Sequence, residues 1–155
     1  MFRVLVVCMG NICRSPMAAS VLQGELERRG LQALVEVDSA GTHGAHAGER
    51  ADRRAVQLTS ERGYPQILRE RSRRIVDADF ERFDLILAMD RHNLARLRDR
   101  CPPAHQHKLH LFLAYAGQDE AGEVPDPYYG PQEGFEVVLK MIERAVPGVI
   151  ERLPL

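Results

Sequence analysis

The chain has 155 residues, of which 45% are hydrophobic and 28% are charged, and its formal net charge at pH 7 is −1. This length suits one domain, residues 1–155, and the composition is that of a soluble globular protein. The balanced charge gives no overall field that would favour nucleic acid or a membrane surface, so we expect neither as a partner. The longest apolar runs are too short to span a bilayer or to act as a signal peptide.

The first elements of the chain predict a strand, a loop and a helix. Residues 2–7 form a β-branched run without alternation, which is typical of a central parallel strand covered on both faces. Ser15 and Pro16 then predict a helix start, because serine can cap exposed amides and proline is tolerated at the first helical position. Apolar residues at helical spacing continue this helix as far as Gly30.

The remaining elements continue the alternation of strands and helices. In chain order we expect a strand at 35–40, a helix at 50–62, a strand at 85–89, a helix at 90–100, a less marked strand at 108–112, a loop at 116–130, and a C-terminal helix with an apolar stripe over 135–149. This order predicts an α/β fold, a three-layer sandwich in which a central four-stranded parallel sheet has helices on both faces. Ligands of such sheets bind beyond the carboxyl ends of the strands, where Cys8, Ser39 and Asp90 should meet.

Residues 8–15, here called the 8–15 loop, form a candidate anion-binding site at the end of the first strand. Gly10 and Asn11 most easily adopt left-handed backbone angles, so they allow successive N–H groups to point inward. Such a nest at a helix N-terminus binds anions, and Arg14 adds a two-pronged donor that matches phosphate oxygens. The alternative is that Cys8 is a small core residue and Arg14 is solvated, but the combined spacing favours the anion site.

Cys8 is the candidate nucleophile of this loop. A free cysteine titrates at about 8.5, and cationic neighbours at a helix N-terminus lower that value. We therefore expect a thiolate that is aimed at the phosphorus of a bound phosphate ester, with Ser15 donating its hydroxyl to the sulfur. The chain has three cysteines, an odd number that makes a poor disulfide framework and fits a reducing compartment, so we expect a cytoplasmic protein.

The sequence VCMGNICRSP at residues 7–16 resembles the phosphate-binding loop (P-loop) of the low-molecular-weight protein tyrosine phosphatases, which has the form C-x5-R-S. The resemblance continues through VDSAGT at 37–42, SRRI at 72–75, AMD at 88–90 with Asn93 and Leu94, and DPYYG at 126–130. These matches span nearly the whole chain, and the pairing of an N-terminal C-x5-R with a C-terminal D-P-Y-Y is highly specific.

The resemblance implies hydrolysis of phosphotyrosine, in a protein or as a small aryl phosphate, without a metal or other cofactor. Cys8 would form a phosphocysteine, while Arg14 and the loop amides hold the equatorial oxygens. Asp126 would act as general acid and then as general base, although an Asp-Pro pair is also an ordinary turn former. The other residues implied to bind substrate are Met9, Gly10, Asn11, Ile12, Cys13, Ser15, Tyr128 and Tyr129.

Several residues near the site have two interpretations that the sequence leaves open. Asn11 and Ser39 either hydrogen-bond each other and support the loop, as the family suggests, or are plain turn residues. Asp90 either anchors the loop or orients Arg14, or it caps the following helix. Cys13 either forms a reversible disulfide with Cys8 that protects the nucleophile, or is a passive small residue.

The chain departs from the family at two positions. Ala45 stands where relatives often have an aromatic residue, which leaves one pocket wall thin unless His46 compensates. Glu70 stands where relatives commonly place histidine behind the loop, which alters the local charge. Tyr128 and Tyr129 form an aromatic wall or are phosphorylation targets.

Two clusters outside the motifs also have alternative interpretations. The arginines at 69, 71, 73 and 74 form a solvated face or steer acidic phosphoproteins toward the site. The histidines at 105, 107 and 110 lack cysteines or carboxylates at a spacing suitable for metal, so we expect no metal site there.

Two other functions compete with phosphatase activity. Arsenate reduction on a related scaffold needs a relay of further cysteines, and only Cys101, which we expect to be inert, lies outside the loop. A non-catalytic phosphotyrosine-binding module would need the anion nest but not an intact acid. The sequence does not determine the oligomeric state, and we expect a monomer.

Overall fold

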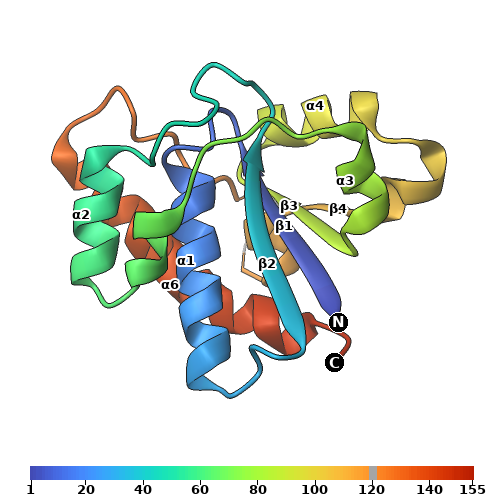
Figure 1. Cartoon of the computed structure of the whole chain (residues 1–155), viewed down its shortest axis with the longest axis horizontal. Coiled ribbons are helices and arrows are strands. Elements are labelled where there is room, and N and C mark those ends of the chain that lie inside the picture. The colour runs from blue at the N-terminus through green and yellow to red at the C-terminus, as the bar shows by residue number, and fades with distance from the viewer. Residues whose placement is uncertain (119–121) are drawn as a thin grey trace.

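The computed structural model describes residues 1–118 and 122–155. In the described part of the chain, one sheet has four parallel strands in the order β2-β1-β3-β4 (Figure 1). The strands are β1 (Phe2–Cys8), β2 (Val35–Gly41), β3 (Leu85–Ala88) and β4 (Leu109–Leu111). The predicted α/β architecture is confirmed.

Helices cover both faces of this sheet. On one face lie α1 (Arg14–Arg28), α2 (Arg53–Glu61), α5 (Phe112–Tyr115) and α6 (Gln132–Arg152), and on the other lie α3 (Asp77–Arg82) and α4 (Arg91–Arg100) (Figure 1). Two short 3₁₀ helices, η1 (Pro65–Arg69) and η2 (Pro103–Lys108), complete the structure.

The central strand β1 contributes to the hydrophobic core on both sides. Val4 and Val6 pack in the cluster that contains α1 and α6, whereas Leu5 and Val7 pack in the cluster that contains α3 and α4. This division follows from the alternation of side chains along a strand. β1 is paired with β2 on one side as far as Cys8 and with β3 on the other as far as Val7, so the chain is held from both directions up to the residue before Cys8.

The start of α1 differs from the prediction in a way that affects the site. The helix begins at Arg14, and its N-cap, Cys13, makes no side-chain capping bond. The expectation that Ser15 caps the helix is wrong, because Ser15 lies inside the first turn and its hydroxyl is engaged by Cys8 and Asn11. Pro16 is tolerated nearby because first-turn amides have no intrahelical acceptor.

The C-terminal helix α6 packs closely on the segment that follows α5. A Cβ atom added to Gly148 would overlap the carbonyl oxygen of Ala116, so this approach requires glycine. Elsewhere in α6, Gly134 has more room, since its added Cβ would lie 3.6 Å from that of Pro127.

The other differences concern short elements. The helix expected at 50–62 begins at Arg53, where Asp52 caps it by accepting a hydrogen bond from the amide of Arg54 at 2.8 Å. The elements η1, α3, η2 and α5 were not predicted. The expected loop at 116–130 agrees with the turns and irregular backbone of 116–118 and 122–130, and its residues 119–121 lie outside the described residues. None of the described helices combines the length and apolar character needed to cross a membrane.

Candidate active site

The 8–15 loop connects the end of β1 to the start of α1, at the carboxyl edge of the sheet. The amides of Thr42 and His43 donate to the carbonyl oxygens of Cys8 and Met9, each at 2.9 Å, and thus attach the loop to the segment after β2. A Cβ atom at Gly41 would lie only 2.6 Å from the Met9 oxygen, so glycine is needed for this close approach.

Asn11 organises the interior of the loop. Its φ of 58° is left-handed, and its side-chain amide donates to the hydroxyls of Ser15 at 2.7 Å and Ser39 at 2.9 Å. Its Oδ1 accepts a hydrogen bond from the amide of Arg73 at 3.0 Å. The hydrogen bond expected between Asn11 and Ser39 is therefore present, and both polar groups of the buried amide are used.

Cys8 lies at the pocket floor, and Ser15 lies directly behind it. The Cys8 Sγ is 3.1 Å from the Ser15 Oγ, and both residues are buried. The Ser15 hydroxyl accepts a hydrogen bond from Asn11, and its own hydrogen has two acceptors in reach, the Cys8 sulfur at 3.1 Å and the Ala40 carbonyl at the longer distance of 3.5 Å.

Arg14 is buried, with 2% of its surface exposed, yet it is surrounded by acidic groups. Its Nη1 donates to Asp90 Oδ2 at 2.6 Å and to the Val124 carbonyl at 2.9 Å, and its Nη2 lies 3.8 Å from Asp126 Oδ2. Burial favours the neutral form of Arg14, but the nearby Cys8, Asp90 and Asp126 outweigh burial and raise the pKa of the guanidinium. The guanidinium is therefore charged and fixed in orientation.

Asp90 makes both of the contacts that the sequence left as alternatives. One carboxylate oxygen binds Arg14, and the other accepts a hydrogen bond from the amide of Asn93 at 2.7 Å as the N-cap of α4. This one side chain ties the helix to the guanidinium.

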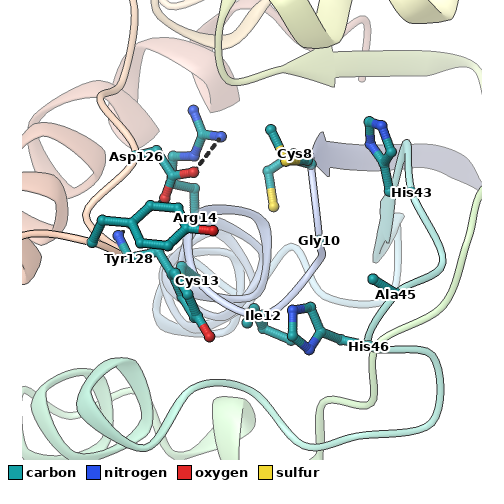
Figure 2. A pocket seen from close by; sticks show the side chains of 12 residues that line it. Cys8, Gly10, Ile12, Cys13, Arg14, His43, Ala45, His46, Asp126 and Tyr128 are labelled. Carbon is teal, nitrogen blue, oxygen red and sulfur yellow. Dashed lines mark hydrogen bonds and ion pairs between the residues drawn. The ribbon is translucent and has the colours of Figure 1, made fainter.

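Asp126 likewise forms a turn and borders the pocket. Its Oδ1 accepts a hydrogen bond from the amide of Tyr128 at 3.1 Å, and 37% of its side chain is exposed. Figure 2 shows Asp126 beside Arg14, with Cys8 next to them at the pocket floor.

These side chains surround a pocket of about 230 Å³. The remaining lining residues are Met9, Gly10, Ile12, Cys13, His43, Ala45, His46, Tyr128 and Tyr129. Asn11 and Ser15, which we expected to bind substrate, do not line the pocket and support the loop from behind. His43 was missed, although its position just after the second strand at the same sheet edge could have indicated it.

Aromatic rings form one wall of the pocket. The rings of Tyr128 and Tyr129 have centroids 4.8 Å apart, and the Tyr128 ring lies 6.2 Å from that of His46. His46 and Ala45 line the pocket together (Figure 2), so His46 occupies space beside the position where the wall was expected to be thin.

Arg54 fixes the position of this aromatic wall. Its Nη2 donates to the Tyr128 carbonyl at 3.0 Å and to Asp52 at 3.0 Å, and its guanidinium lies over the rings of Tyr128 and Phe135. The segment that carries Asp126 is thereby attached to α2.

Comparisons with known proteins identify the family of this chain. The sequence model of the family "Low molecular weight phosphotyrosine protein phosphatase" matches residues 3–154. This chain belongs to that family. A low molecular weight protein-tyrosine-phosphatase of Streptomyces coelicolor is 43% identical over 96% of this chain and 92% of its own, and a putative one of Synechocystis is 40% identical over 97% and 96%. The crystal structure of an Entamoeba histolytica protein tyrosine phosphatase, with Hepes in its active site, has a TM-score of 0.92 and 38% identity over 98% of this chain and 96% of that one.

The three cysteines of this phosphatase are free thiols. Burial raises the pKa of Cys13 far above its ordinary value, with further contributions from Asp52, Cys8 and Asp126, so its thiol is protonated. A disulfide between Cys8 and Cys13 stays a prediction. Cys101 packs in the core cluster on the other face of the sheet from Cys8, which argues against a cysteine relay between them.

Behind the loop of the phosphatase, Glu70 extends the hydrogen-bond network of Asn11. Its Oε2 accepts from the Ser39 hydroxyl at 3.4 Å. Burial and the charge of Asp38 raise the pKa of Glu70 to about 7, against the opposing effects of Ser39 and Arg73. Glu70 thus places a group that titrates near neutrality behind the loop.

The structure also describes the two clusters noted in the sequence. Arg73 is half-buried and pairs with Asp38 and Asp79, whereas Arg69, Arg71 and Arg74 are exposed, and Arg71 donates to the Gly48 carbonyl. Across the described ranges, no group of three or more His, Cys, Asp or Glu side chains is arranged to hold a metal ion.

Proposed function

We propose that this protein tyrosine phosphatase hydrolyses phosphotyrosine and other aryl phosphate monoesters through a phosphocysteine on Cys8. The observation that carries the proposal is the convergence of Cys8, Arg14 and Asp126 on one pocket at the N-terminus of α1. A phosphate in this pocket would receive hydrogen bonds from the loop amides and from Arg14, with favourable interaction from the helix dipole. Arg14 uses Nη1 for internal hydrogen bonds, so Nη2 and Nε are the donors left for phosphate oxygens.

In the first step, the Cys8 thiolate attacks phosphorus and the bond between phosphorus and the phenol oxygen breaks. Asp126, in its protonated form, transfers its proton to that oxygen, so a neutral phenol leaves. The aryl group lies against the Tyr128 wall, which selects a flat ring. The arginine and the amides stabilise the charge that develops on the equatorial oxygens.

In the second step, water attacks the phosphorus of the phosphocysteine. The Asp126 carboxylate accepts the proton of the water, the bond between sulfur and phosphorus breaks, and phosphate is released. Ser15 donates a hydrogen bond to the departing sulfur and keeps its proton, which stabilises the thiolate that re-forms. Atoms and protons balance without any further reactant.

Kinetics of aryl phosphate hydrolysis by three variants test the mechanism. Cys8→Ser should abolish turnover, and Cys101→Ser, a matched change at a cysteine outside the pocket, should leave it intact. Asp126→Asn should slow turnover by about 10²–10⁴-fold. The loss should be larger for phenyl phosphate, whose leaving group needs the proton, than for 4-nitrophenyl phosphate, whose leaving group is already stable as an anion.

Acid quenching and mass spectrometry should detect a phosphate on Cys8 during turnover. Normal turnover in Cys8→Ser, or an equal loss for both leaving groups in Asp126→Asn, would contradict the assigned roles. We also propose that the substrates are phosphotyrosine proteins or small aryl phosphates, and that the free thiols function in the cytoplasm of the cell.

A further inference from the structure

Two arginines, Arg74 and Arg96, and one histidine, His92, gather beside His43, on the side of the pocket away from Asp126 and Tyr128. Figure 2 shows His43 across Cys8 from those two residues. Arg74 packs against this segment, since a Cβ atom at Gly44 would lie 3.4 Å from its Cδ. Burial, followed by repulsion from Arg96, His92 and Arg74, lowers the pKa of His43, which agrees with their proximity. We call Arg74, His92 and Arg96 the cationic patch.

The fold fixes the position of this patch relative to the reacting groups. His92 and Arg96 are four residues apart on α4, so they lie on the same side of the helix. The first turn of α4 is held at the pocket by Asp90, which binds Arg14. Arg74 comes from another segment, which β2 holds through the bridge between Gly41 and Arg74.

The patch lacks internal counter-charges. Its three residues are exposed, and within residues 1–118 and 122–155 none of them forms an ion pair. Neighbouring acids are engaged elsewhere: Asp90 binds Arg14, and Glu123 accepts from the amide of Arg91. Asp99 is one turn further along α4 and makes no ion pair with Arg96. By contrast, Arg73 and Arg100 are both paired with aspartates.

Resting on the proposed hydrolysis of phosphotyrosine, we infer that Arg74, His92 and Arg96 bind carboxylate side chains that flank the phosphotyrosine of a protein substrate. The pocket takes the aryl phosphate, and the patch at its rim offers positive charge to the adjoining peptide. A partner with acidic residues there supplies counter-charges that residues 1–118 and 122–155 do not provide. Charged rim residues of this kind act mainly on association and specificity rather than on chemistry.

The inference predicts that the enzyme prefers acidic phosphopeptides to neutral ones. A small aryl phosphate has no flanking residues, so its turnover does not depend on these three side chains. Each exposed arginine should contribute about two- to five-fold to kcat/KM for an acidic phosphopeptide, which is the range expected for a solvent-exposed ion pair. The preference should decrease as salt screens the charges.

The test uses two pairs of phosphotyrosyl peptides. Within a pair, the peptides differ only by glutamate or glutamine beside the phosphotyrosine. One pair carries this residue on the N-terminal side and the other pair on the C-terminal side. For the wild type at low salt, kcat/KM should be higher for a glutamate peptide than for its glutamine counterpart. In the double variant Arg74→Gln/Arg96→Gln this ratio should fall to near one, while kcat/KM for 4-nitrophenyl phosphate stays within about two-fold. Arg98→Gln, an exposed arginine further along α4, is the matched control and should keep the wild-type ratio.

A charge reversal sharpens the result. Arg74→Glu/Arg96→Glu should prefer a lysine peptide over the glutamate peptide, which general loss of stability could not produce. A wild-type ratio near one on both sides, with normal 4-nitrophenyl phosphate turnover, would overturn this inference and leave the proposed function intact. Absence of Cys8-dependent turnover would instead reject the proposed function. A gain seen with a second phosphate but not with glutamate would overturn the assignment to carboxylates.

Discussion

Replacing Glu70 with glutamine should make the stability of the protein less dependent on pH. The folded-state pKa of Glu70 is about 7, above the ordinary value of 4.5 that we take for the unfolded chain. Between these values the unfolded state releases the proton and the folded state retains it. The contribution of Glu70 to stability is therefore fully present below about pH 4.5 and is lost as the pH rises through about 7.

The magnitude follows from this difference in pKa. At ~1.36 kcal/mol for each pKa unit, the raised value corresponds to about 3 kcal/mol of unfolding free energy. Because Glu70 keeps part of its surface in water, screening reduces this, and we expect about 1–2 kcal/mol. Glutamine preserves the shape and can still accept from Ser39, but it carries no charge beside Asp38.

Urea unfolding at several pH values between about 5 and 8 measures the effect. Glu70→Gln should be more stable than the wild type by about 1–2 kcal/mol at the alkaline end, and the two should converge near pH 5. Glu81→Gln, which changes an exposed glutamate, should follow the wild type throughout. If the curves for the wild type and Glu70→Gln stay parallel across this range, burial of Glu70 does not control its protonation and the reasoning is refuted.

Two further changes test the backbone and packing of the molecule. Asn11→Ala should lower both kcat for an aryl phosphate and stability, because alanine is strained at the left-handed φ by about 1–2 kcal/mol and three hydrogen bonds are lost. Asn11→Gly should recover part of the stability, because glycine adopts the left-handed φ without strain, but it should not recover kcat. Equal unfolding free energies for the two variants would show that backbone strain does not contribute to the loss of stability. Gly148→Ala should destabilise by about 1–3 kcal/mol, since overlap with Ala116 outweighs the helix propensity gain of about 1 kcal/mol. Gly134→Ala, in the same helix but with room for a methyl group, should be neutral or stabilising, and a stabilised Gly148→Ala in urea unfolding would contradict the packing.

The sheet was largely predictable because β1 and β3 are buried apolar runs, whereas β2 carries polar residues and is only half-buried in its middle. The fourth strand is only three residues long, and Phe112, expected to extend it, begins α5 instead. Elements of four to six residues, such as α3, are too short to show a periodic pattern. Ser15 has the residue type of a cap, but contacts with a sulfur and an amide from the loop determine where its hydroxyl points.

Site residues that are close together in the sequence were predictable from their spacing, and residues from distant segments were not. The spacing of Cys8 and Arg14 indicated an anion site directly, whereas assigning Asp126 needed the family resemblance because it comes from a distant loop. The arginine run is contiguous in the sequence, yet Arg73 turns to Asp38 and Asp79 while Arg74 packs against the segment at Gly44. The residues that we group with Arg74 come from α4, and no local pattern connects these two segments.

Cys8 lies at the end of the most enclosed strand of the sheet. This position separates residues that tolerate substitution from residues that do not. Substitutions in β1 disturb two cores at once, so selection has little freedom there. Residues that line the pocket near its opening, such as Ala45, His46 and Tyr129, belong to segments outside that strand. Descendants of such a gene can therefore acquire new substrates by altering the entrance while they inherit the same reaction.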